Sequence, residues 1–192
     1  MAIQINGNGT ITGISVGGLP DGIVDTDMIA NNAVTNAKAT GIAGGKVLQV
    51  VQGLTYSRAE VNSAAFTATH SQISITPSAA NSKILYSFNG DCNNNGDGYY
   101  MYLTVFRNIA GAGWVENAPN GGTGNFGFTR NGETGDRQET PYNILYLDSP
   151  SYTLGQTIEY KLYIRNDGAG TVELPCSPSR EPAISIAQEI SA

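Results

Sequence analysis

Aromatic residues are absent from the first quarter of the chain, and this asymmetry constrains the fold more than any other feature of the sequence. All sixteen aromatic side chains lie at or after Tyr56, and residues 1–46 contain none. Ordering a residue costs about 1 to 2 kcal/mol of backbone entropy, which the few Ile and Val side chains of this segment do not offset within one chain. The sequence therefore predicts an N-terminal arm, residues 1–46, and one folded domain, residues 47–192.

Two interpretations of the arm stay open, disorder and burial against other chains. Disordered segments are usually rich in charge and poor in β-branched residues, whereas the arm has five charged side chains and regularly placed isoleucines. We therefore expect an attachment and trimerisation arm. The apolar spacing after Thr26 fits a short helix, with a coiled linker as an equal alternative. The expected interface residues are Ile3, Ile5, Ile11, Ile14, Met28, Ile29, Ala33 and Ala37.

The sequence after Gly44-Gly45 reads as short strands separated by clusters of Gly, Pro, Asn and Asp. Residues 157–165 alternate most clearly. The apolar face of this strand would hold Ile158, Tyr160, Leu162 and Ile164. Strands without intervening helices are typical of sandwiches and barrels. We predict an all-β fold, an antiparallel jelly-roll β-sandwich preceded by an extended N-terminal arm with a short helix.

Several stretches resemble a module of known proteins. Residues 45–52 (Gly-Lys-Val-Leu-Gln-Val-Val-Gln), residues 73–78 with 81–85, and residues 184–190 (Ile-Ser-Ile-Ala-Gln-Glu-Ile) look like the start, middle and end of one β-sandwich module. That module recurs in tail-fibre and virion appendage proteins of marine tailed bacteriophages, including cyanophage-like ones. Residues 24–34 are similar to the linker that often precedes it. The resemblance implies a homotrimeric jelly-roll knob, similar in shape to tumour necrosis factor and the complement globular heads, held on a virion through its arm.

Charge and apolar patterning limit the compartment and the partners. Ten basic against sixteen acidic side chains give a net charge of −6, which leaves no basic stripe for nucleic acid. The opening residues lack a signal peptide, and no apolar run approaches the roughly 20 residues of a membrane helix. We expect assembly in a host cytoplasm, a virion location and no membrane insertion. In that compartment Cys92 and Cys176 are more often thiols than a bridge.

Residues 91–97 match the first half of a calcium loop, with oxygen ligands at alternate positions followed by Gly. The second half fails, because Tyr102 stands where the motif requires Glu. A hairpin turn explains the same residues and is the favoured alternative. The ligands of a weak calcium site would be Asp91, Asn93, Asn95 and Asp97.

Little in the sequence points to catalysis. The single imidazole, His70, lies in residues 67–72, which read as a turn between strands, and an exposed structural role is the expectation. The carboxylates Glu133 and Asp136 lie in a long polar loop, residues 114–137, where solvation is the default. We expect no enzymatic activity and no cofactor.

Three functions remain: a structural virion appendage, which we favour; a receptor-binding tip; and a polysaccharide depolymerase, for which the chain lacks the repeats of a β-solenoid. The partners would be two further copies, tail or capsid proteins bound by the arm and, for a tip, a host surface glycan. The ten tyrosines fit either a trimer interface or scattered outer faces. The glycan contacts would be Trp114, Asn125, Phe126 and Tyr152.

Overall fold

The computed structural model describes residues 4–5, 11–12, 46–95, 100–117, 127–130, 138–168, 170–175 and 182–192. The chain divides into two units, Met1–Ala43 and Gly44–Ala192. In the first, β1 (Gln4–Ile5) and β2 (Ile11–Thr12) form an antiparallel pair with Ile5 opposite Ile11. The expected helix lies outside the described residues, and so do six of the eight expected interface residues: Ile3, Ile14, Met28, Ile29, Ala33 and Ala37.

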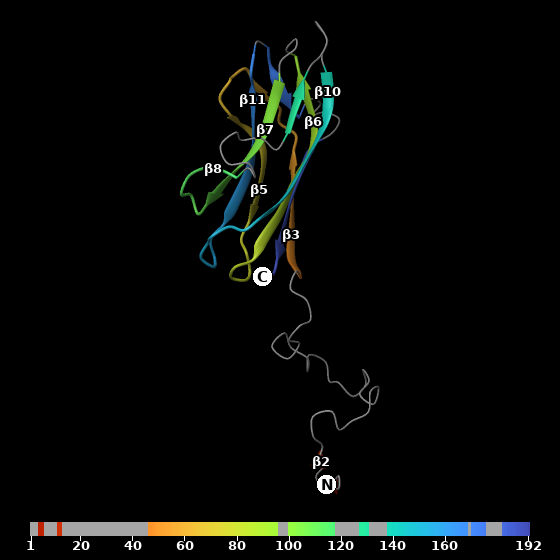
Figure 1. Ribbon diagram of the computed structural model, residues 1–192, viewed down its shortest axis with the longest axis vertical. Coiled ribbons are helices and arrows are strands. Elements are labelled where there is room, and N and C mark those ends of the chain that lie inside the picture. Colours follow the sequence, from red (N-terminus) through yellow and green to blue (C-terminus); the bar gives the residue numbers. More distant parts are fainter. Residues whose placement is uncertain are drawn as a thin grey trace. The chain divides into compact units, whose positions relative to one another are not determined.

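Two antiparallel sheets packed face to face form the second unit (Figure 1). The large sheet contains β3 (Val47–Thr55), β13 (Ala183–Ile190), β6 (Lys83–Asn94) and β10 (Gln138–Asp148), extended by β12 (Val172–Leu174) and β4 (Ala59–Val61). The small sheet contains β5 (Thr67–Ile75), β11 (Ile158–Asn166), β7 (Tyr100–Ile109), β8 (Val115–Glu116) and β9 (Gly127–Arg130). From β4 to β12 the chain crosses repeatedly from one sheet to the other. Strands β4, β6, β10 and β12 belong to the large sheet, and β5, β7 and β11, which come between them in the sequence, belong to the small sheet. The predicted all-β fold, a sandwich of two antiparallel sheets, is confirmed.

The core lies between the sheets, and β11 contributes to it as the alternation predicts. Tyr160, Leu162 and their neighbours Ile158 and Ile164 have no exposed surface. The intervening side chains point away from the core. Among them Tyr163, the exception to the polar pattern, stacks its ring on that of Phe106 with centroids 4.0 Å apart. Its aromatic surface is therefore covered on the outside of the small sheet.

The turn predicted for residues 67–72 is wrong, because β5 begins at Thr67. Because polar residues lie on both faces of this strand, the sequence lacks the alternation of apolar and polar residues that predicts a strand. Thr69 and Ser71 point into the sandwich and are buried. The Thr69 hydroxyl donates to the Leu162 carbonyl at 2.7 Å and accepts from the Ser71 amide at 3.1 Å, so burial leaves it satisfied.

Two other loop predictions need correction. Strand β6 continues through Asn94, so Asp91 and Asn93 lie in a strand and not in a turn. The long loop over residues 114–137 is interrupted by β8 and β9, both paired with β7. Pairing gives these polar segments backbone partners that the sequence pattern does not reveal.

Strand β13 carries its isoleucines on the outside. Its inward side chains are small or polar, and Ser185 and Glu189 are buried. The Ser185 hydroxyl lies 3.3 Å from the Gly53 carbonyl of β3 and 3.2 Å from the Gln72 carbonyl of β5. A Cβ on Gly53 would lie 2.6 Å from that hydroxyl. The two sheets therefore approach closely here because these positions hold small residues.

Lys46, just before β3, and Ser191, just after β13, lie side by side at one end of the sandwich. The Ser191 amide donates to the Lys46 carbonyl at 2.9 Å, and the Lys46 amide donates to the Ser191 hydroxyl at 3.2 Å. Ile190 pairs with Val47 and Lys83 at this end. The opposite end of β6, at Asn94, pairs with β10 and β12. The connections β6–β7, β9–β10 and β12–β13 therefore start near the end of the sandwich opposite Lys46.

Candidate functional site

The described residues do not include a group of three or more His, Cys, Asp or Glu side chains placed to hold a metal ion. Nor does that part of the chain contain a helix long and apolar enough to cross a membrane. Candidate functional sites are therefore sought in the buried polar clusters and on the two outer faces of the sandwich.

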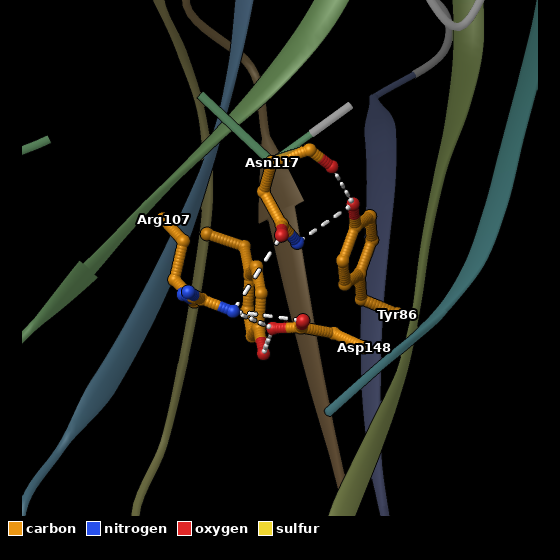
Figure 2. A network of polar contacts seen from close by, with 5 residues as sticks. Tyr86, Arg107, Asn117 and Asp148 are labelled. Carbon is orange, nitrogen blue, oxygen red and sulfur yellow. Dashed lines mark hydrogen bonds and ion pairs between the residues drawn. The ribbon is translucent and has the colours of Figure 1, made fainter. Parts of the chain in front are cut away.

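A charged network crosses the interior between the sheets (Figure 2). The buried Asp148 carboxylate of β10 accepts two hydrogen bonds from Arg107 Nη1 of β7, at 2.8 and 2.7 Å, and one from the Tyr160 hydroxyl of β11, at 2.7 Å. Asn117 lies within hydrogen-bond distance of the Tyr86 hydroxyl. Burial, reinforced by the Asp148 charge, raises the pKa of both tyrosines well above the ordinary value. These hydroxyls therefore stay protonated, and the network ties the sheets together.

A second buried carboxylate, Glu189 of β13, holds the connection between β5 and β6. It accepts hydrogen bonds from the Ser78 amide and hydroxyl, the Ala79 amide, the Ser82 hydroxyl and the Gln49 side-chain amide, at 2.8 to 3.0 Å. Burial alone would raise the pKa of Glu189, but these hydrogen bonds outweigh burial and lower it to about 2. The ionised carboxylate is thus a structural anchor.

We expect the domain to lose stability as the pH falls from about 4.5 to about 2. The pKa of Glu189 is lower in the folded state than its ordinary value of 4.5, so its contribution is complete above pH 4.5 and is lost as pH falls through the folded pKa of about 2. Urea unfolding at pH 7, 4 and 2.5 measures this. Glu189→Gln should be less stable than the wild type at pH 7 and should show a weaker loss below pH 4.5. Equal pH dependence in the two proteins would contradict this role.

Two of the four residues proposed for calcium, Asn93 and Asn95, make hydrogen bonds within the protein. Asn93 is buried, and its Nδ2 donates to Glu173 at 3.1 Å and to Asn95 Oδ1 at 3.2 Å. Arg58 Nη1 lies 3.2 Å from the same Glu173 carboxylate. Asn93 Oδ1 is buried without a hydrogen-bond partner, as a ligand atom would be. However, Asn95 Oδ1 already accepts from an amide, and Asp97 lies outside the described residues. The geometry therefore favours a structural contact.

Two further side chains with reactive groups, Cys92 and His70, lie in strands of the sandwich. Cys92 is a buried thiol whose Sγ lies 3.1 Å from the Thr140 carbonyl, and Cys176 lies outside the described residues. His70 is exposed on β5, and its carbonyl accepts from the Thr55 hydroxyl at 3.4 Å.

The proposed glycan contacts do not gather at one place. The Tyr152 hydroxyl donates to the Ala79 carbonyl at 2.7 Å and accepts from the Ser82 amide at 2.9 Å, so its hydrogen bonds support the β5–β6 connection. Trp114 lies after the β7–β8 turn, over the outer face of the small sheet. Asn125 and Phe126 are outside the described residues.

Trp114 belongs to an aromatic and cationic cluster on the small sheet, which sequence reasoning missed. Its ring lies 6.3 Å from the Tyr163 ring, and Lys161 Nζ lies 4.9 Å from its centroid. Further along, the Arg165 guanidinium lies 3.9 Å from the Tyr102 centroid. Alternation along residues 157–165 predicts that Lys161, Tyr163 and Arg165 share one face of the strand. Their contacts with Phe106 and Tyr102 on β7 can be found only when the pairing of β11 with β7 is known.

The outer face of the large sheet is aliphatic and exposed. Strand pairing places Gln52, Ile186, Ser87 and Leu145 in one row across β3, β13, β6 and β10. Leu145 is 62% exposed and Val50 60%. The polar side chains within this area are uncharged, and Asn143 donates to Asn89 there. We call this surface the aliphatic face: Val50, Leu54, Leu85, Leu145, Leu147, Ile184 and Ile186.

Comparison with known proteins gives distant structural similarity only. No family model and no curated protein matches the chain. Among solved structures, it is similar to the structure of infectious bursal disease virus Gt strain, with a TM-score of 0.38, 12% identity and coverage of 78% of this chain and 39% of that one. For the Gx strain the TM-score is 0.31, with 15% identity and coverage of 78% and 37%. The chain thus spans about two fifths of each matched chain.

Proposed function

We propose that the chain is a non-enzymatic structural protein of a virion, a tail fibre or appendage of a tailed bacteriophage, homotrimeric and attached through its N-terminal arm. The observation that carries the proposal is the pair of hydrogen bonds between Lys46 and Ser191 at one end of the sandwich. The chain enters the sandwich at Lys46, and the connections β6–β7, β9–β10 and β12–β13 start near the opposite end. This polarity suits a knob displayed on a stalk. The sequence resemblance to phage appendage modules supports the same assignment.

The buried carboxylates support the non-enzymatic part of the proposal. Asp148 pairs with Arg107, Glu189 anchors a connection, and Glu173 contacts Arg58 and Asn93. A general acid or base must reach a substrate proton directly or through one water. These carboxylates instead bind groups of the fold itself, so their loss would affect stability first.

Deleting residues 1–44 should abolish incorporation into virions while leaving the domain folded. The described core residues all lie beyond this cut, so a cooperative urea unfolding transition should remain. Incorporation is measured by quantitative mass spectrometry of gradient-purified particles made from the genome that encodes the chain, with the full chain as control. Undiminished incorporation would contradict attachment through the arm. Loss of the unfolding transition would contradict the domain boundary.

A receptor-binding tip is the second candidate, and the aromatic and cationic cluster around Trp114 favours it. Aromatic rings such as Trp114 and Tyr163 combine large apolar area with polar tips, which suits sugar recognition. Binding on a glycan array distinguishes this candidate from a purely structural role. Release of reducing sugar from host polysaccharide would instead indicate a depolymerase.

A further inference from the structure

We propose that the aliphatic face is the surface through which copies of this chain bind one another. The number of copies, three, rests on the proposed function. The choice of surface rests on the geometry of the large sheet. The inference assigns self-association to the aliphatic outer face of the large sheet, whereas the sequence pattern pointed to the arm or to a tyrosine-rich interface.

The aliphatic face is a large and exposed part of the outer sheet surface. Its rows cross four strands, and strand spacing and rise give an area of about 20 Å by 20 Å, or about 400 Å² in projection, with the polar positions between the aliphatic ones included. The largest apolar patch on a typical monomer covers about 300 to 600 Å² and is often functional, so this face is a candidate interaction site. Leu145 and Leu147 lie on one side of it, and Val50 and Leu54 on the other, all between 46% and 62% exposed. The patch is therefore continuous across the sheet.

A second copy fits this surface better than a charged partner. Side chains between the aliphatic residues are amides and a hydroxyl, which both donate and accept hydrogen bonds and so can pair with polar groups of neighbouring copies around a three-fold axis. These polar residues are Gln52, Ser87, Asn89, Asn143 and Gln188. The chain has a net charge of −6, so two copies carry the same net charge and repel each other on average. Contact through an uncharged face avoids placing like charges together.

The outer face of the small sheet lacks these properties. Glu159, Lys161 and Arg165 of β11 lie there. Its aromatic side chains are half-buried against one another and against the cations. The two outer faces therefore differ in kind, and the large sheet is the one suited to a dry interface.

The test is the mass of the full-length chain in solution with a charge placed in the face. The wild type should sediment as a trimer of about 60 kDa, three times the chain mass of 20.1 kDa. Leu145→Glu on β10 and Val50→Glu on β3 should each raise the dissociation constant at least about 100-fold and give monomers at micromolar concentration. Leu154→Glu is the matched control, because Leu154 is 58% exposed and lies outside the aliphatic face. It should leave the trimer intact.

Each outcome decides the inference separately from the proposed function. Trimers that persist in both face variants would overturn the inference and leave trimerisation to the arm. A monomeric wild type would overturn both the inference and the proposed trimer. If that monomer's arm became protease-sensitive in Leu145→Glu, the occupant of the face would be the arm of the same chain. Thermal unfolding of each variant shows whether it remains folded.

Discussion

Leu162→Ala is expected to lower the free energy of unfolding by about 2 to 5 kcal/mol, the range for truncating a fully buried leucine. Leu162 has no exposed surface, and its strand, β11, is paired on both sides within the small sheet. Its side chain lies in the core between the two sheets, so the substitution leaves a cavity among packed side chains. Chemical denaturation followed by circular dichroism measures the loss.

Lys161→Ala is the matched control on the opposite face of the same strand. Its ammonium lies over the Trp114 ring, a contact worth about 0.5 to 1 kcal/mol at an exposed site. The expected loss is therefore below about 1 kcal/mol. Similar losses for Lys161→Ala and Leu162→Ala would contradict the assignment of the two faces.

Asp148→Asn should cost about 3 kcal/mol. The substitution keeps an acceptor for the Tyr160 hydroxyl but leaves the Arg107 charge without its counter-ion between the sheets. Removing one partner of a buried ion pair costs about 3 to 5 kcal/mol. The lower end applies because the Arg107 side chain is 24% exposed. Denaturant unfolding at neutral pH gives the value.

Glu60→Gln provides the comparison for this ion pair. Glu60 contacts Arg58 at 3.5 Å with 61% of its side chain exposed, and exposed pairs contribute about 1 kcal/mol or less. If Asp148→Asn cost no more than Glu60→Gln, the network would be weakly coupled to folding.

Sequence patterning predicts the fold where one face of a strand is apolar and the other polar. Leu162 and Lys161 alternate in that way, so β11 and its inward face follow directly. Strand β5 cannot be predicted in the same way because Thr69 and Ser71, on its inward face, are polar and buried. The Thr69 hydroxyl donates to the Leu162 carbonyl. This partner lies on β11, far away in the sequence.

The surfaces are less predictable than the core. Alternation in residues 183–190 identifies a strand, but hydrophobicity alone would place Ile184 and Ile186 inside. Ser185 lies inward because Gly53 and Gln72 approach it, and these three come from different strands. The aliphatic face therefore becomes visible only when strand pairing is known.

A one-residue slip of β13 would exchange its two faces and produce a competing register. Burial of Ile184 and Ile186 would favour the slipped strand. Two inward side chains oppose it, since slipping would remove Glu189 from the Ser78 and Ala79 amides and bring a bulky side chain against Gly53. The polar and small residues of β13 thus select one pairing during folding, at a cost in hydrophobic burial within the monomer.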